Sequence, residues 1–523
     1  MSKLNTIGTQ LYNGLSLAVR SEDDLLRAQA KAEKVNIVGA GEVLTAAYEQ
    51  LRNAAENTEE HLLVQNAIRR FYKQLFVTRD KELIDTSGKE LAIELTYAGY
   101  VANNTLTEKQ ITSISKNAAA HFALYEQLQQ RRGINGDASA GWVLDTLSAS
   151  ITRELSCNQK DAVFVSVAYE YFEKTASSHR KAATLDVDER GAALFVAVHK
   201  ALLKSNAAVI REALLSRYGV DTTNEDRYIA YNQRIDTLLR SPVTDTFQHL
   251  VDRQGAPFRI VRRMIEDKSD FVQLLASRDA FLDAFEQQVS REYSNIMSRV
   301  NRAIVRSVIF LIITKFLVGI EIEVPYDLWA HSKVMWQPLL INLFFPPIYM
   351  VALRLTLNLP GAANTQALVD RIDVMLYGNE TTMLIKKQSQ LGKRYNSLFS
   401  GVYVLFSLLV FAGVIWLLLS LGFELVHIAI FFTFISAASF LGFRLSRLIR
   451  ELEIVRSSSN GFTFVRDVIY LPFVVVGRWM SEKYAQVNVV ALVLDMMIEL
   501  PLKTILRLIR QWGAFIDDRK DRI

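Results

Sequence analysis

The pattern of apolar and polar residues divides the chain into a charge-rich part and an apolar part. Charged residues are frequent up to about residue 300, whereas nearly all long apolar runs lie between residues 303 and 445. A helix needs about 20 apolar residues to cross the hydrocarbon core of a bilayer. Four segments meet this requirement, at residues 303–320, 335–353, 397–421 and 425–443. The pattern therefore predicts four membrane spans.

The charges beside these segments predict their orientation, because Lys and Arg stay on the cytosolic side of a membrane. The connection between the first and second segments contains Glu321, Glu323 and Asp327, with Lys333 as its only full positive charge, and Gly422–Glu424 between the third and fourth lacks Lys and Arg. Positive clusters lie at the opposite ends, at Arg299, Arg302, Arg306, Arg354, Lys386, Lys387, Lys393, Arg394, Arg444, Arg447 and Arg450. We expect both termini in the cytosol. The alternative, four buried helices of a soluble core, does not account for this alternation.

Residues 1–300 show the periodicity of an all-α cytosolic domain. Helical spacing is present at Val64, Ile68, Phe71 and Leu75, and again at Leu194, Val198, Ala201 and Leu202. Ser205 is placed to cap a following helix and Gly219 to end it. Polar and Gly-containing breaks near residues 133–136, 138–141 and 220–225 separate the helices, and we expect a division into two parts near residues 131–142. Met1–Arg20 lacks the basic stretch and apolar core of a signal peptide.

The end of this domain predicts a continuous helix into the first span. Ser277–Val318 contains neither Gly nor Pro, and an apolar stripe follows its length. The stripe consists of Phe281, Phe285, Val289, Tyr293, Ile296, Val300 and Ile304. Such a helix holds the domain rigidly relative to the membrane, and rigidity alone does not establish signalling.

Between the second and third spans, Leu368, Ile372 and Met375 predict an amphipathic cytosolic helix that begins at a Thr365 cap and ends near Gly378. Residues 301–447 form the predicted transmembrane region, and residues 448–523 form a cytosolic or interfacial helical tail.

Two short apolar runs in the tail, Val468–Gly477 with Pro472 inside it and Val487–Leu494, are too short for straight crossings. They lie at the interface, re-enter the bilayer or pack on the N-terminal domain. The final helix, Leu502–Ile516, is basic and amphipathic, and we expect Lys503, Arg507 and Arg510 to contact anionic lipid headgroups. The alternative is an ordinary surface helix with a solvated basic face.

Polar residues inside the spans are the candidate functional positions, because polar groups are costly in hydrocarbon. Lys315 either extends its ammonium outward toward Glu321 and Glu323 or lines a polar pathway. Pro346 and Pro347, next to Asn342, predict a kink in the second span. Transporters build binding sites from broken helices, whereas many membrane helices carry prolines without such a role. The small residues Ser436, Ala438, Ser439 and Gly442 predict close helix packing. We interpret His427 as an interfacial side chain.

Composition narrows the class of function. The net charge is a modest +5, so we expect no nucleic acid partner. The single cysteine, Cys157, forms no intramolecular disulfide and matches no metal spacing. The sequence lacks a Walker loop, H-E-x-x-H, G-x-S-x-G and C-x-x-C, and Gly39–Gly41 is only a fragment of a phosphate loop. We therefore expect no metal, no cofactor and no enzymatic activity.

These observations lead to a first hypothesis and two alternatives. We expect a non-enzymatic scaffold or interaction protein in a bacterial inner membrane, which binds the bilayer and a protein partner through residues 1–300. The first alternative is a subunit of a homo-oligomeric transporter or channel, because four spans are few for a pore in one chain. The second is an enzyme whose site has no recognised motif.

Overall fold

The computed structural model describes residues 4–37, 46, 49, 62–156, 159–176, 187–357, 359–378, 396–455 and 461–486. Within these residues, every secondary-structure element is a helix, apart from one isolated β-bridge. This confirms the predicted all-α fold. The chain divides into two compact units: an N-terminal unit, Thr6–Gly255, and a span unit, Ala256–Val487 with the N-terminal residues through Asn5. The domain boundaries expected near residues 300 and 447 stay predictions.

The N-terminal unit is a set of packed helices in which α7 contacts α3, α6 and α10. Its helices are α1 (Thr6–Lys31), α3 (Leu63–Thr78), α4 (Lys81–Asp85), α5 (Ser87–Tyr97), α6 (Glu108–Gln130), α7 (Gly136–Ser156), α8 (Lys160–Ala176), α9 (Val187–Val198), the π-helix η2 (His199–Leu203), α10 (Ala207–Arg217), α11 (Glu225–Leu239) and α12 (Pro242–Gln254). Helix α1 packs against α8, and α9 packs against α12.

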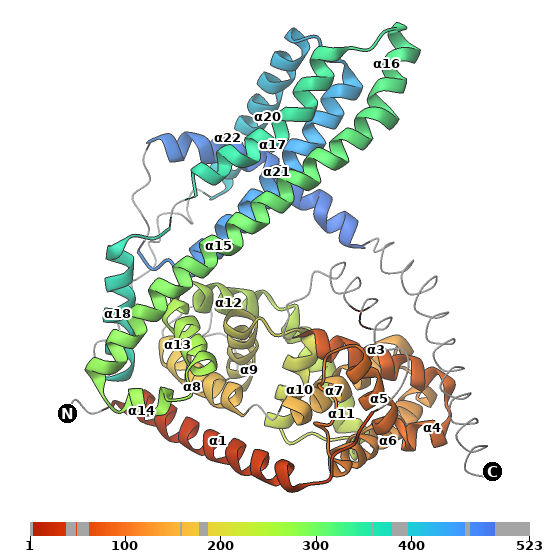
Figure 1. Cartoon of the computed structure of the whole chain (residues 1–523), viewed down its shortest axis with the longest axis vertical. Helices are drawn as coiled ribbons and strands as arrows, with labels where there is room; N and C mark the ends of the chain where they lie inside the picture. Colours follow the sequence, from red (N-terminus) through yellow and green to blue (C-terminus); the bar gives the residue numbers. More distant parts are fainter. Residues whose placement is uncertain are drawn as a thin grey trace. The chain divides into compact units, whose positions relative to one another are not determined.

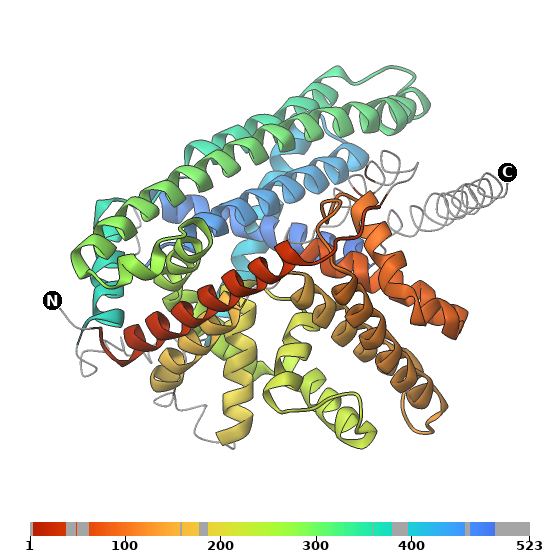
Figure 2. The same cartoon turned by 60° about the horizontal axis from the view of Figure 1, so that its bottom comes forward.

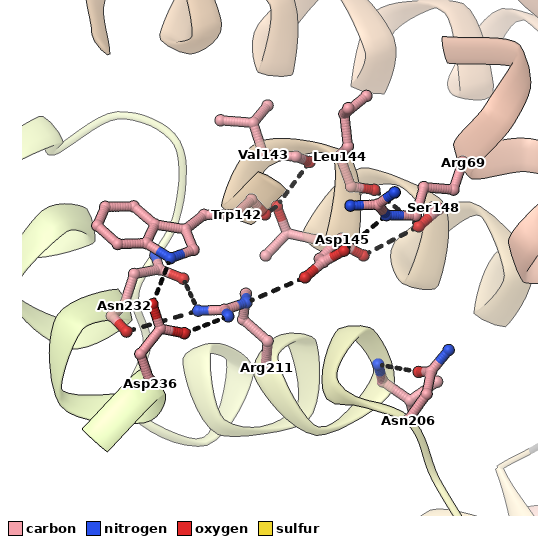
Figure 3. A network of polar contacts seen from close by, with 12 residues as sticks. Arg69, Trp142, Val143, Leu144, Asp145, Ser148, Asn206, Arg211, Asn232 and Asp236 are labelled. Atoms are coloured by element: carbon pink, nitrogen blue, oxygen red, sulfur yellow. Dashed lines mark hydrogen bonds and ion pairs between the residues drawn. The ribbon is translucent and has the colours of Figure 1, made fainter. Parts of the chain in front are cut away.

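A buried arginine joins three helices of this unit (Figure 3). Arg211 on α10 donates to Asn232 at 2.8 Å and to Asp236 at 2.5 Å, both on α11, and lies 3.5 Å from Asp145 on α7. The Trp142 indole on α7 donates to the same Asp236 carboxylate at 2.8 Å. Because buried charges need partners, these contacts fix how α7, α10 and α11 pack.

Local details of this unit differ from the sequence-based expectations. Helix α3 is present and Ile68 is buried as expected, but farther along the helix Tyr72 and Phe76 are buried in place of Phe71 and Leu75, which are half-buried. The cap of α10 is Asn206, whose side chain accepts from the Val209 N–H at 3.0 Å. Ser205 was the wrong residue, because its hydroxyl lies 3.2 Å from His199 Nδ1 instead.

Two of the expected breaks in this unit lie between helices, and one does not. Residues 131–135 separate α6 from α7, and residues 218–224, which include Gly219 at φ +59°, separate α10 from α11. Residues 138–141 lie inside α7 and do not form a break.

The span unit is organised around a helix of 54 residues, Arg278–His331, drawn in green in Figure 1. It consists of α15 (Arg278–Val318), the π-helix η3 (Gly319–Glu323) and α16 (Val324–His331). The other helices are α13 (Ala256–Asp267), α14 (Phe271–Leu275), α17 (Trp336–Leu355), α18 (Ala362–Leu376), α20 (Asn396–Ser420), α21 (Leu425–Arg450) and α22 (Gly461–Gln486). The expected continuous helix from Ser277 to Val318 is confirmed, with Ser277 as its N-cap residue.

Four described helices are long and apolar enough to cross a membrane: Arg278–His331, Trp336–Leu355, Gly401–Ser420 and Leu425–Arg450. They correspond to the four expected spans. The first differs at its end, because the helix continues past Ile320 and includes Glu321, Glu323 and Asp327, which we had expected in a connecting loop.

Helix α21 is the centre of this bundle, and Figures 1 and 2 show it beside α15 and α17. Its four small candidate residues, Ser436, Ala438, Ser439 and Gly442, are all buried. Ala438 belongs to a core cluster with Val300, Ile304 and Leu311 of α15, Met350 of α17 and Leu445 of α21. The Ser439 hydroxyl lies 2.8 Å from the Tyr349 hydroxyl on α17.

The base of α15 packs against α13, α14 and α18. Leu368, Ile372 and Met375 form the buried stripe of α18, as expected, and Gly378 follows its end. The helix begins earlier than expected, at Ala362 after Gly361, so Thr365 lies inside the helix and does not cap it. A bidentate pair of Arg278 with Asp373, at 2.7 Å for each contact, joins α15 to α18.

Helix α22 includes the apolar run Val468–Gly477 and extends it on both sides to 26 residues. It packs against α21 and α20. The other expectations for the tail lie outside the described residues: Val487–Leu494, the helix Leu502–Ile516, and Lys503, Arg507 and Arg510 in it. Cys157 and Gly39–Gly41 also lie outside them.

The contact between α21 and α22 gives a prediction with an internal control. A Cβ added at Gly477 lies 2.2 Å from the Ser436 carbonyl oxygen and 2.8 Å from Phe440 Cβ, so Gly477→Ala forces the two backbones apart. Gly413→Ala on α20 meets nothing within 4 Å. We expect Gly477→Ala to destabilise the detergent-solubilised protein by about 1–3 kcal/mol and Gly413→Ala to leave its thermal midpoint unchanged or slightly raised. Equal midpoints for the two variants would contradict this packing.

Candidate functional site: a buried polar cluster among the span helices

Five polar side chains from three of the candidate spans meet inside the span unit, and we refer to them as the polar cluster. They are Lys315 in α15, Glu323 in η3, Asp327 in α16, Asn342 in α17 and His427 in α21. Lys315 is 2% exposed and the other four residues are 0% exposed. Charged groups in such surroundings are costly unless they are paired, so the arrangement of the cluster carries functional information.

The centre of the cluster is an ion pair within one helix. Lys315 Nζ lies 2.5 Å from Glu323 Oε1, eight residues along the chain. In a regular α-helix, residues eight apart differ by about 80° around the axis. The π turn Gly319–Glu323 accommodates about one extra residue, which brings Glu323 onto the face of Lys315. Of the two acidic residues that we considered for Lys315, Glu323 is its partner, and Glu321 is exposed.

Asn342 connects this ion pair to two other helices. Its Nδ2 donates to Glu323 Oε1 at 3.1 Å and to the carbonyl oxygen of His427 at 3.2 Å. Pro346 lies one turn further along α17 and has no N–H to donate to the Asn342 carbonyl. Helix α17 continues through Pro346 and Pro347, both of which are buried. The structure thus brings Lys315 and Asn342 together around one carboxylate, with the two prolines directly beyond.

Asp327 and His427 form the second half of the cluster. Asp327 Oδ2 accepts from the Met335 N–H at 2.8 Å. Asp327 Oδ1 lies 3.2 Å from His427 Nε2, although the two atoms are not aligned as a hydrogen bond. Unpaired buried polar atoms within the cluster are Glu323 Oε2, Asp327 Oδ1, Asn342 Oδ1 and both ring nitrogens of His427. Unpaired polar atoms are rare in protein interiors, and here they gather at one place.

A half-exposed rim lies next to the buried cluster. Glu424 accepts from the Tyr326 hydroxyl at 3.0 Å and lies 2.7 Å from His331 Nε2. The Tyr326 ring packs edge-on to His427, with ring centroids 6.1 Å apart. Trp329, Trp336 and Trp416 are exposed near this end of the bundle. Tryptophan and tyrosine gather where a membrane meets water, so these residues are those expected at an interface.

Sequence reasoning identified Lys315 and Asn342 and named Glu323 as one of two possible partners of Lys315, but it missed Asp327. It also placed His427 at the interface, which was wrong, because the side chain is buried. The available signal was spacing: Glu323 and Asp327 are four residues apart, so they share a helix face if the helix continues. We had placed both in a loop because acidic residues after an apolar run are typical of a span's end. His427 is far from them in sequence, and only the folded arrangement brings it near.

Among the described residues, no group of three or more His, Cys, Asp or Glu side chains is arranged to hold a metal ion. The cluster instead offers buried charge, unpaired hydrogen-bonding atoms and an ionisable imidazole. Comparison of the chain with models of protein families, with curated proteins and with solved structures gave no match. The geometry of the chain itself is therefore the basis for its proposed function.

The central ion pair gives a prediction for stability. Lys315→Met leaves Glu323 buried without its cation, and breaking a buried pair in this way costs about 3–5 kcal/mol. The double variant Lys315→Met/Glu323→Gln removes both charges, and we expect it to recover most of that loss. The matched control is Glu321→Gln in the same π turn, which changes an exposed carboxylate. Thermal unfolding in detergent, followed by circular dichroism, measures all three. A double variant that is no more stable than Lys315→Met would contradict the pairing.

Proposed function

We propose that the protein is a multi-pass membrane protein with four crossings and both termini in the cytosol. The different residues at the two ends of the span bundle support this. Val300 and Ile304 of α15 pack in one core cluster with Leu445 of α21, so the exposed arginines beside these residues lie at the same end of the bundle. These arginines are Arg299, Arg302, Arg306, Arg444, Arg447 and Arg450. The exposed tryptophans and the acidic residues lie near the other end, which fits the positive-inside rule.

We propose further that the protein acts as a non-enzymatic membrane anchor or scaffold, which presents its helical N-terminal unit at the cytosolic surface of a bacterial plasma membrane. The observation that carries this proposal is the burial of the polar cluster. Lys315 and Asn342, the residues that would line a transport pathway, are 2% and 0% exposed and bind Glu323. This burial fits a closed helix bundle that anchors the protein better than it fits a transport pathway.

The proposed partners are the bilayer and a protein. Anionic lipid headgroups suit the arginine clusters at the cytosolic end and the basic residues Lys503, Arg507 and Arg510. A protein partner would bind the N-terminal unit, whose surface includes the exposed apolar side chains of Leu17 and Val77. Single exposed apolar residues are common on soluble surfaces, so these two positions serve as probes of a contact rather than as proof of one.

One observation favours the second candidate, a subunit of an oligomeric transporter or channel. Glu323 Oε2 and Asn342 Oδ1 are buried and unpaired, and unpaired oxygen atoms beside a proline-containing helix are a feature of transporter sites. This candidate requires a homo-oligomer, because four spans are few for a pathway within one chain.

The orientation can be tested by cysteine labelling in a Cys157→Ser background. Lys333 between α16 and α17 and Gln366 on α18 are both exposed. We expect Lys333→Cys to react with a membrane-impermeant maleimide in intact cells, because it lies at the outer end of the bundle. Gln366→Cys should react only after permeabilisation, because α18 lies at the arginine-rich end. The reverse pattern, or equal reaction of both, would contradict the proposed topology.

The scaffold proposal can be tested with a photo-cross-linking amino acid at Leu17 or Val77 of the full chain in cells. We expect cross-linked protein of one discrete mass from at least one of these positions. The matched control is Leu408 on α20, an exposed apolar position that should face lipid and yield no protein product.

Reconstitution distinguishes the two candidates. The scaffold proposal expects proteoliposomes that contain the purified protein to show no flux of protons, Na⁺ or K⁺ above empty vesicles. Flux that is lost in Lys315→Met/Glu323→Gln, which we expect to recover most of the stability lost in the single variant, would favour the transporter and contradict the scaffold.

A further inference from the structure

The polar cluster carries an odd number of fixed charges. Lys315 contributes one positive charge, and Glu323 and Asp327 contribute two negative charges, all of them buried. With a neutral His427 the cluster therefore holds one uncompensated negative charge. An unpaired buried charge destabilises a protein, so a cation beside Asp327 would stabilise the cluster.

We propose that the His427–Asp327 pair is a proton-binding site. The lone pair of His427 Nε2 accepts a proton from hydronium, which leaves water, and the resulting imidazolium pairs with the Asp327 carboxylate 3.2 Å away. No other bond changes. The cluster then consists of two neutral ion pairs, Lys315–Glu323 and His427–Asp327. This inference does not depend on the scaffold function.

The unpaired atoms of the cluster support this ligand. A proton on His427 Nε2 gives Asp327 Oδ1, which is buried and lacks a hydrogen bond, a charged donor beside it. The imidazolium also has a donor at Nδ1. Asn342 Oδ1 is a buried, unpaired acceptor in the same cluster, and Asn342 Nδ2 donates to the His427 carbonyl. The added proton on Nε2 thus pairs His427 of α21 with Asp327 of α16.

Groups on every neighbouring element affect the same proton. Asp327 on α16 and, through Asn342, Glu323 in η3 favour the imidazolium, whereas Lys315 on α15 opposes it. On α21 itself, Glu424 lies one turn before His427 and is engaged by Tyr326 and His331. Because Tyr326 contacts both the His427 ring and Glu424, this half-exposed rim is the route by which we expect the proton to arrive.

Binding of the proton has a structural consequence at one end of the bundle. The protonated pair links α16 to the first turn of α21, where His427 lies. Loss of the proton leaves a buried negative charge between α16 and α21 and weakens the packing of these two helix ends. The site therefore makes the packing of these two helix ends depend on the pH of the compartment that the rim faces.

The test is nitrogen NMR of the full chain in lipid nanodiscs, with ¹⁵N-labelled histidine. The His427 signal is assigned by its loss in His427→Gln. We expect both ring nitrogens of His427 to be protonated at pH 6, because the Asp327 carboxylate lies 3.2 Å from Nε2 and pairs with the imidazolium. In Asp327→Asn the doubly protonated signal should be lost at the same pH. The matched control is His249→Gln, which removes an exposed histidine of the N-terminal unit and should leave the His427 signal unchanged.

Two results would overturn the proposal. One is a neutral His427 at pH 6 in the folded wild-type protein, which needs no variant and is decisive even if Asp327→Asn fails to fold. The other is a His427 that is neutral in Na⁺ buffer and changes when Na⁺ is replaced by a large organic cation, because a metal ion would then supply the missing charge. A His427 signal in Asp327→Glu that matches wild type, together with the loss in Asp327→Asn, supports the ion pair.

Discussion

The Lys315–Glu323 ion pair is the constraint on which the span unit depends. Neither charge can remain in hydrocarbon alone, and eight residues of regular helix would turn the two side chains away from each other. The π turn at Gly319–Glu323 corrects the rotation and lets the helix continue into α16. Asp327, four residues later, is then also turned inward. The single ion pair thus determines where the first span places its acidic residues and which surface the other helices must cover.

The helices that cover this surface approach closely because α21 carries small residues where it meets its neighbours. A Cβ at Gly442 would lie 2.8 Å from Leu353 of α17, and Gly477 of α22 faces the Ser436 carbonyl. In lipid the hydrophobic effect does not drive helices together, so close van der Waals packing and buried hydrogen bonds must do so. The small-residue contacts and the polar cluster therefore act together: the first allows the approach, and the second specifies the register.

The sequence predicted the features that depend on neighbouring residues in the chain. It did not predict the features that depend on contacts between residues distant in sequence. Span lengths, the continuous helix from Ser277 and the buried stripe of α18 follow from periodicity over neighbouring positions. Helix caps were less certain, since Ser205 and Asn206 are both good N-cap residues and adjacent. Glu323 and Asp327 were misplaced because a carboxylate after an apolar run usually lies in a water-exposed loop at the end of a span. Only the distant His427 and Asn342 change that expectation, and their proximity is a property of the folded chain.

The first helix is much longer than a membrane crossing requires. Its 54 residues span about 80 Å, whereas the hydrocarbon core is about 30 Å thick. If Arg306 lies at the cytosolic interface, the 28 residues back to Arg278 extend about 40 Å beyond it, where Arg278 pairs with Asp373. A rigid rod alone transmits no signal, because coupling requires an element with two states. The proposed proton site supplies two charge states at the far end of that rod. Within the span unit, this one helix therefore carries both the proposed proton site and the Arg278 pair with Asp373.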